Sequence, residues 1–134
     1  MFSRAAILVL VVGSVAAFAV ADRDPDAVRT VHVRIHLSRF EPGAFVFAPG
    51  DRVRFVVHNA DPIPHEFILG DRTVQLLHER GTEAYHPPRP GEMTMAPGDT
   101  MTTTYAFEEP GRLTLGCHLP GHFAYGMRAP VVVG

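Results

Sequence analysis

Short segments of alternating polar and apolar residues, separated by turn residues, run through most of the sequence and restrict it to an all-β fold. Residues 30–37 alternate strictly, which predicts a half-buried strand with Val31, Val33, Ile35 and Leu37 on its inner face. Further segments rich in β-branched and aromatic residues lie at 45–47, 53–58, 102–107, 112–115 and 129–133. This spacing of short strands and turns predicts an antiparallel β-sandwich.

One segment departs from this pattern. Residues 71–80 carry residues such as Val74 and Leu77 at helical spacing, and Asp71 is suited to cap the first turn. We therefore expect one short helix here. Residues 82–98 are rich in proline and are expected to form a loop.

The N-terminal segment has the features of a secretory signal peptide. Arg4 precedes a charge-free apolar run, and residues 19–21 (AVA) form a cleavage motif of small residues, so we expect a signal peptide over 1–21 with cleavage before Asp22. A retained membrane anchor is the alternative, although the run is short for a spanning helix. Residues 22–134 are long enough for one domain and too short for two.

The single cysteine, Cys117, is unusual for an exported protein. An oxidising compartment favours disulfides, yet the chain holds no second cysteine with which Cys117 could pair. Charged residues are scattered, and no basic cluster suggests binding to nucleic acid. We expect a periplasmic or secreted protein, a monomer, with no stable insertion in the membrane after signal cleavage.

The segment that follows the last predicted turn carries metal-binding chemistry. Cys117, His122 and Met127 stand at C-x4-H-x4-M spacing and offer a thiolate, an imidazole and a thioether. Two histidines and one cysteine with a weak axial methionine suit a single copper ion that cycles between Cu(I) and Cu(II). His65, which ends the proline-containing loop NADPIPH, is the candidate for the second histidine.

These motifs resemble the cupredoxins, the blue-copper family. The segment FVVHNA at 55–60 leading to Pro64-His65 is similar to plastocyanin, and the C-x4-H-x4-M loop has the ligand spacing of auracyanin and rusticyanin. Together with residues 65–71 and 96–99, these motifs resemble bacterial plastocyanin-like copper proteins. The resemblance implies a Greek-key β-sandwich with one short helix after the first ligand strand. It also implies that His65, Cys117, His122 and Met127 bind one copper ion.

Glu66 departs from the family pattern. Plastocyanin and azurin place an asparagine here that helps to tie the two ligand loops together, and a carboxylate cannot donate as that amide does. The reduction potential and colour of the site are therefore open. Asn59 is a candidate for part of this tie.

Two functions fit these features. The leading hypothesis is a one-electron carrier outside the cytoplasm that serves a redox partner such as a cytochrome or an oxidase. We expect an electron to leave through His122, past an apolar patch of Leu119, Pro120 and Phe123. The alternative is a copper-binding or copper-delivery protein, a chaperone or buffer.

An enzyme is not expected. The loop is similar to the last copper motif of multicopper oxidases, but Gly116 stands where they have a histidine, and one small domain offers no further histidine pairs.

The copper-delivery alternative depends on soft side chains between the helix and the later strands. Thioether and imidazole groups there, from His78, His86, Met93 and Met95, could form a second copper site. Ordinary surface and core packing is the competing interpretation.

Overall fold

The structure is a computed structural model that describes residue 24, residues 27–81 and residues 86–134. The expected signal peptide and its cleavage point before Asp22 lie outside the described residues. In chain order the elements are β1 (Val28–His36), β2 (Arg39–Glu41), β3 (Phe45–Phe47), β4 (Asp51–Asn59), β5 (His65–Gly70), α1 (Arg72–Glu79), β6 (Glu92–Met95), β7 (Thr100–Phe107), β8 (Gly111–Gly116) and β9 (Arg128–Val133).

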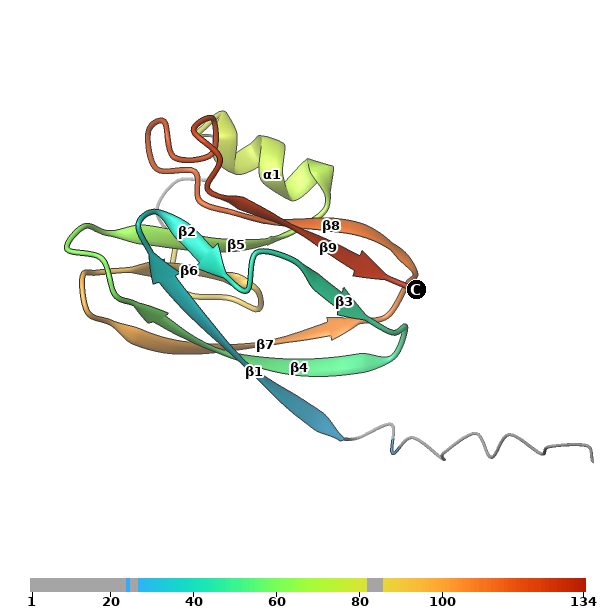
Figure 1. Ribbon diagram of the computed structural model, residues 1–134. Helices are drawn as coiled ribbons and strands as arrows, with labels where there is room; N and C mark the ends of the chain where they lie inside the picture. The colour runs from blue at the N-terminus through green and yellow to red at the C-terminus, as the bar shows by residue number, and fades with distance from the viewer. Residues whose placement is uncertain (1–23, 25–26, 82–85) are drawn as a thin grey trace, which may run out of the picture.

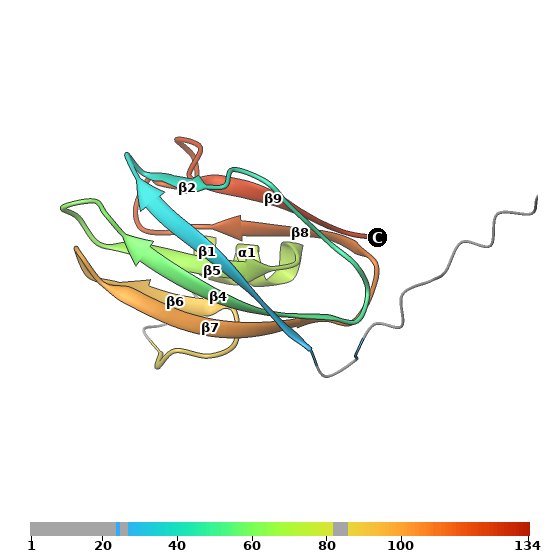
Figure 2. The ribbon, with the colours of Figure 1, turned by 60° about the horizontal axis from the view of Figure 1, so that its bottom comes forward.

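Two sheets pack face to face, which confirms the all-β sandwich (Figures 1 and 2). One sheet has the order β2-β1-β4-β7 and the other β3-β9-β8-β5-β6. Two ladders are parallel, β1 with β4 and β3 with β9, whereas the sequence predicted antiparallel pairing. The chain leaves the first sheet after β2, adds β3 to the second sheet and returns at β4. Because of this crossing, β4 runs beside β1 in the same direction.

The core lies between the sheets and is built from alternate residues of each strand. Val33 and Ile35 of β1 are buried as predicted, and the rings of Phe47 and Phe107 stack with their centroids 4.3 Å apart. Leu37 was predicted to join this face, but it is 76% exposed. The strand ends at His36, and Leu37 and Ser38 turn the chain into β2 with φ of 52° and 53°. The alternation therefore stops one residue earlier than the sequence suggested.

The predicted helix is present as α1 and packs on the outer face of the five-stranded sheet, against β5 and β8 (Figure 1). The side chain of Asp71 accepts a hydrogen bond from the Val74 N–H at 3.0 Å, which caps the first turn. Gln75 is the buried residue of the helix, and Leu77, one of the residues at helical spacing, is 39% exposed. No helix of the described residues is both long enough and apolar enough to cross a bilayer.

The segment expected to be a loop, residues 82–98, contains a strand. β6 pairs with β5 in antiparallel register, with Met95 opposite His65 and Met93 opposite Phe67. Both methionine side chains are buried in the core. Of the four residues of β6, only Thr94 favours a strand, so pairing with β5 rather than local propensity creates this strand.

The sandwich brings three connections to one end. The β1–β2 turn, the β4–β5 loop and the long β8–β9 loop lie at the end away from the C-terminus (Figure 1). All four predicted metal ligands lie on or beside the latter two loops.

Candidate metal centre

Three of the predicted ligands come together where the β4–β5 and β8–β9 loops meet. His65 opens β5, Cys117 directly follows β8, and His122 lies in the loop beyond it. The Cys117 Sγ lies 3.3 Å from the His122 Nδ1 and 4.0 Å from the His65 Nδ1. The donor atoms of the three residues all lie within 4.8 Å of one another. His65, which lies more than fifty positions before Cys117 in the sequence, therefore joins Cys117 and His122 in one compact donor set.

Met127 is held beside this set by the backbone of its own loop. Its N–H donates to the His122 carbonyl at 2.9 Å, and its carbonyl accepts from the Cys117 N–H at 3.2 Å. The side chain is buried. The fourth predicted ligand is thus fastened by main-chain hydrogen bonds to the two loop ligands.

Asp61 fixes the orientation of His65. The Asp61 Oδ2 lies 2.9 Å from the His65 Nε2, and both residues are buried. A carboxylate only accepts, so Nε2 carries the hydrogen and Nδ1 presents its lone pair towards Cys117. Partners of this kind commonly orient metal-binding histidines. The sequence interpretation missed Asp61, although its place four residues before His65 was a usable signal.

The same carboxylate also joins the β1–β2 turn to the site. Asp61 accepts from the N–H groups of Leu37 and Ser38 at 2.7 and 2.8 Å. Burial by itself would raise the pKa of Asp61, but these two N–H groups and His65 together bring it below its usual value. Burial lowers the pKa of His65 despite the opposing effect of Asp61. His65 is therefore neutral at pH 7, as a metal ligand must be.

Cys117 is fully buried and is a thiol rather than a thiolate in this environment. Burial is the main cause that raises the pKa of Cys117 to about 11, and the nearby Glu66 carboxylate adds to it. The N–H groups of Glu66 and Leu119 oppose this effect. Binding of a metal must therefore displace the thiol proton.

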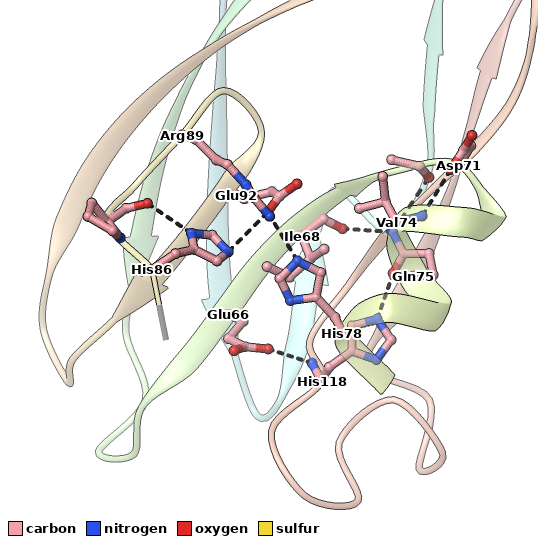
Figure 3. A network of polar contacts seen from close by, with 12 residues as sticks. Glu66, Ile68, Asp71, Val74, Gln75, His78, His86, Arg89, Glu92 and His118 are labelled. Carbon is pink, nitrogen blue, oxygen red and sulfur yellow. Dashed lines mark hydrogen bonds and ion pairs between the residues drawn. The ribbon is translucent and has the colours of Figure 1, made fainter. Parts of the chain in front are cut away.

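Glu66 ties the two ligand loops together by a route that the sequence did not predict. Its backbone N–H donates to the Cys117 Sγ at 3.3 Å, and its carboxylate accepts from the His118 N–H at 2.9 Å (Figure 3). The Glu66 carboxylate therefore accepts a hydrogen bond at the position where plastocyanin and azurin have an asparagine amide that can donate one. Asn59, the residue proposed for this tie, instead donates to the carbonyl of Ile63 in its own loop and to that of Ala96 in the β6–β7 connection.

The residues next to Cys117 face the helix. The His118 Nε2 lies 2.7 Å from the Gln75 Oε1, so its ring points away from the donor set (Figure 3). A Cβ at Gly116 would lie 2.8 Å from both Gln75 Oε1 and Phe123 Cε2, which leaves no space for the histidine of an oxidase motif. Phe123 stacks on His118 with ring centroids 4.6 Å apart. It was expected beside His122 in an exit patch, and it packs on the helix side instead.

Comparison with known proteins identifies the family. Residues 28–134 match the family described as copper binding proteins, plastocyanin/azurin family. The chain belongs to this copper-binding family. The cupredoxin resemblance of the sequence motifs is thereby confirmed, and with it copper as the cofactor.

Similar proteins include copper-resistant cuproproteins. The protein CopI of Rubrivivax gelatinosus is 34% identical over 111 residues, which cover 80% of this chain and 67% of that protein. CopI of Vibrio cholerae is 33% identical over 82 residues, covering 59% of this chain and 48% of that protein. The chain thus spans about two thirds and about half of the lengths of these relatives.

Solved structures share the fold at lower identity. Auracyanin B superposes with a TM-score of 0.66 at 20% identity, covering 79% of this chain and 88% of auracyanin B. The multicopper oxidase mgLAC superposes with a TM-score of 0.58 at 22% identity, and the match covers 80% of this chain but only 39% of mgLAC. The cupredoxin fold therefore occurs both alone and as part of larger oxidases.

The donor set fits a copper ion of this family. At the bond lengths of a zinc site, about 2.3 Å to sulfur and 2.0–2.1 Å to nitrogen, such donors lie about 3.5–3.8 Å apart at trigonal or tetrahedral angles. The two observed sulfur–nitrogen distances, 3.3 and 4.0 Å, fall on either side of that range. His65, Cys117, His122 and Met127 together form a site of the type 1 copper kind.

Proposed function

We propose that this protein is a mononuclear type 1 copper protein that carries one electron at a time outside the cytoplasm. In this proposal His65 and His122 would hold copper through Nδ1, Cys117 through Sγ, and Met127 through its thioether as the weakest of the four ligands. Copper supplies the Cu(I)/Cu(II) couple, and the chain holds the donors in place. The protein performs no substrate turnover of its own.

The observation that supports electron transfer is the network of hydrogen bonds that holds the donors and their loop in place. Asp61 orients His65, the Glu66 N–H restrains the Cys117 sulfur, and Met127 is hydrogen-bonded to both Cys117 and His122. Donors that are fixed in this way change little when the charge on the metal changes, and a small rearrangement makes electron transfer fast. Bracing also slows loss of the ion.

His122 is the route by which an electron would leave. His65, Cys117 and Met127 are buried, whereas His122 is half-buried in a loop whose Pro120 is exposed. A redox partner such as a cytochrome or an oxidase could therefore dock over this loop. The expected periplasmic or secreted location and the signal peptide over 1–21 belong to the same proposal.

Voltammetry combined with copper exchange tests this function. We expect a reversible one-electron wave from the copper-loaded protein and slow loss of Cu(I) to a chelator. Met127→Leu should keep copper and raise the potential, because a thioether that stabilises Cu(II) is removed. An irreversible wave with rapid loss of Cu(I) would contradict electron carriage.

Copper delivery or buffering is the second candidate, and the named relatives favour it. Both CopI proteins are described as copper-resistant cuproproteins. Rapid transfer of Cu(I) to an acceptor protein, faster than electron exchange, would favour this function over the first.

A further inference from the structure

A second group of possible metal ligands lies on the helix side of the five-stranded sheet, outside the Cys117 centre. His78 comes from the last turn of α1, Glu92 from the start of β6, and His86 from the segment before β6. The Glu92 Oε2 lies 3.0 Å from the His78 Nε2 and 3.2 Å from the His86 Nε2 (Figure 3). One donor atom from each residue lies within 4.8 Å of the others.

These distances match a metal-binding triad. Nitrogen and oxygen ligands at about 2.0–2.2 Å from a common ion are separated by about 3.0–3.5 Å. The side chains of His78, His86 and Glu92 are 6%, 22% and 11% exposed, so the group is sheltered but can be reached from one side. The His86 face gives an ion a path of entry.

The orientation of His86 is the observation that most favours a cation. The His86 Nδ1 lies 2.9 Å from the Pro87 carbonyl, which only accepts, so Nδ1 carries a hydrogen. The His86 Nε2 faces the Glu92 Oε2 at 3.2 Å, and these two atoms need either a proton or a metal ion between them. A metal ion can take the place of that proton. A backbone carbonyl that holds the other ring nitrogen is also a common partner of metal-binding histidines.

We propose that His78, His86 and Glu92 form a second metal site, for a divalent ion of the Cu(II) or Zn(II) kind. Two imidazoles and one carboxylate form a borderline-to-hard ligand set that suits these ions, with Cu(II) bound more tightly by the usual order of affinities. Met93 and Met95 take no part, because both are buried in the core. Since no thioether is available, the group does not suit Cu(I). A water molecule completes the coordination.

Arg89 competes with the ion for Glu92. Its Nε donates to the Glu92 Oε2 at 2.7 Å, and its side chain is 44% exposed, so it can move aside (Figure 3). Removal of this charge should therefore strengthen metal binding. A group that served only as a structural ion-pair cluster would show no gain.

The site also lies close to the Cys117 loop. The ring of His78 stacks with that of His118 at 6.0 Å between centroids, and His118 follows Cys117 in the chain. The proposal does not depend on the type 1 assignment, because the two donor sets share no residue.

Titration of the copper-loaded protein with a second equivalent of Cu(II), followed by electron paramagnetic resonance, tests the proposal. We expect a second signal from nitrogen and oxygen ligands, distinct from that of a thiolate-bound ion. His86→Gln and Glu92→Gln should each weaken this second binding by about tenfold or more. Arg89→Gln should strengthen it. His58→Gln is the matched control, because His58 is an exposed histidine that bonds Thr100 on a strand.

Two results would overturn the second site: binding of one equivalent only, or a second equivalent that H86Q and E92Q bind as tightly as the unchanged protein. Calorimetric titration with Zn(II) gives an independent reading if the Cys117 centre fails to form. If the thiolate signal were absent and the signal from nitrogen and oxygen ligands were present, this would contradict the proposed function but not the second metal site.

Discussion

Asp61 shows how much of the centre depends on one residue that binds no metal in our proposal. Its carboxylate accepts from two backbone N–H groups of the β1–β2 turn and from His65. A buried acceptor that loses its charge leaves some of these donors poorly paired, at a cost of about 1–3 kcal/mol. The residue therefore links the stability of the sandwich to the orientation of a ligand.

Asp61→Asn should lower the free energy of unfolding of the metal-free protein by about 1–3 kcal/mol at pH 7. The folded pKa of Asp61 is lowered, so its contribution is present above the unfolded value of about 3.9 and is lost as the pH falls through the folded pKa. Urea denaturation at several pH values measures this. A difference between the two proteins that stayed constant into strong acid would contradict the assigned role.

Glu66→Gln should raise the reduction potential by tens of millivolts while copper is retained. Glutamine can still accept from the His118 N–H, but the negative charge that favours Cu(II) near Cys117 is lost. Glu108→Gln is the control, because it makes the same charge change on an exposed residue after β7, at the opposite end of the sandwich. Voltammetry of the unchanged protein, E66Q and E108Q measures the shift. A lower potential in E66Q would contradict the claim that the Glu66 charge favours Cu(II).

Copper binding should release about one proton from Cys117. With a pKa of about 11 the thiol is protonated throughout the physiological range, so the apparent affinity for Cu(II) should rise about tenfold per pH unit from pH 6 to 8. His65 adds no proton, because its lowered pKa leaves it neutral. Calorimetry in buffers of different ionisation enthalpy counts the protons, and a pH-independent affinity would disagree with a thiol ligand.

At the scale of elements, the close contact between β5 and α1 depends on a glycine. A Cβ at Gly70 would lie 2.6–2.8 Å from three side-chain atoms of Val74. Such contacts cannot be accommodated without a shift of the helix. The helix carries Gln75 and His78, so this contact also positions the residues behind the Cys117 loop.

Gly70→Ala should therefore destabilise the protein by about 1–3 kcal/mol. Gly43→Ala is the matched control, because its new Cβ would meet only the Phe40 carbonyl oxygen, at 3.8 Å. Urea midpoints of both variants give the comparison. Equal midpoints would mean that the helix moves without cost.

The elements that the sequence predicted are those with a strong local pattern. β1, β4 and β9 alternate or carry runs of valine, and α1 has both its spacing and its Asp71 cap. β2 and β6 are three and four residues long and become strands because neighbouring strands pair with them. β2 still matters for the centre, because Arg39 donates to the Gly126 carbonyl in the ligand loop at 3.0 Å.

The metal ligands were predictable because their residue types and their spacing in the sequence indicate copper binding. A lone cysteine with a histidine and a methionine at fixed distances indicated copper, and the family match agrees. The hydrogen bonds of Asp61 and Glu66 to the ligand loops were not predictable, because a sequence does not indicate which groups a loop carboxylate contacts. The grouping of His78, His86 and Glu92 likewise needs the packing of α1 on the sheet.

At the scale of the whole molecule, the sandwich separates three tasks. The core between the sheets holds the buried phenylalanines, one end of the sandwich holds the Cys117 centre, and the helix side holds the second histidine group. Of the four ligands proposed for the Cys117 centre, His122 alone is half-buried, and it gives this centre its contact with the outside. This arrangement suits exchange of an electron rather than of a ligand.

The visible absorption spectrum of the copper-loaded protein, compared with that of Cys117→Ser, tests the central claim most directly. A thiolate bound to Cu(II) produces an intense charge-transfer band that a serine oxygen cannot produce. We predict the band in the unchanged protein and its loss in the variant. An unchanged band in C117S, or its absence from the copper-loaded protein, would contradict a type 1 copper centre at Cys117.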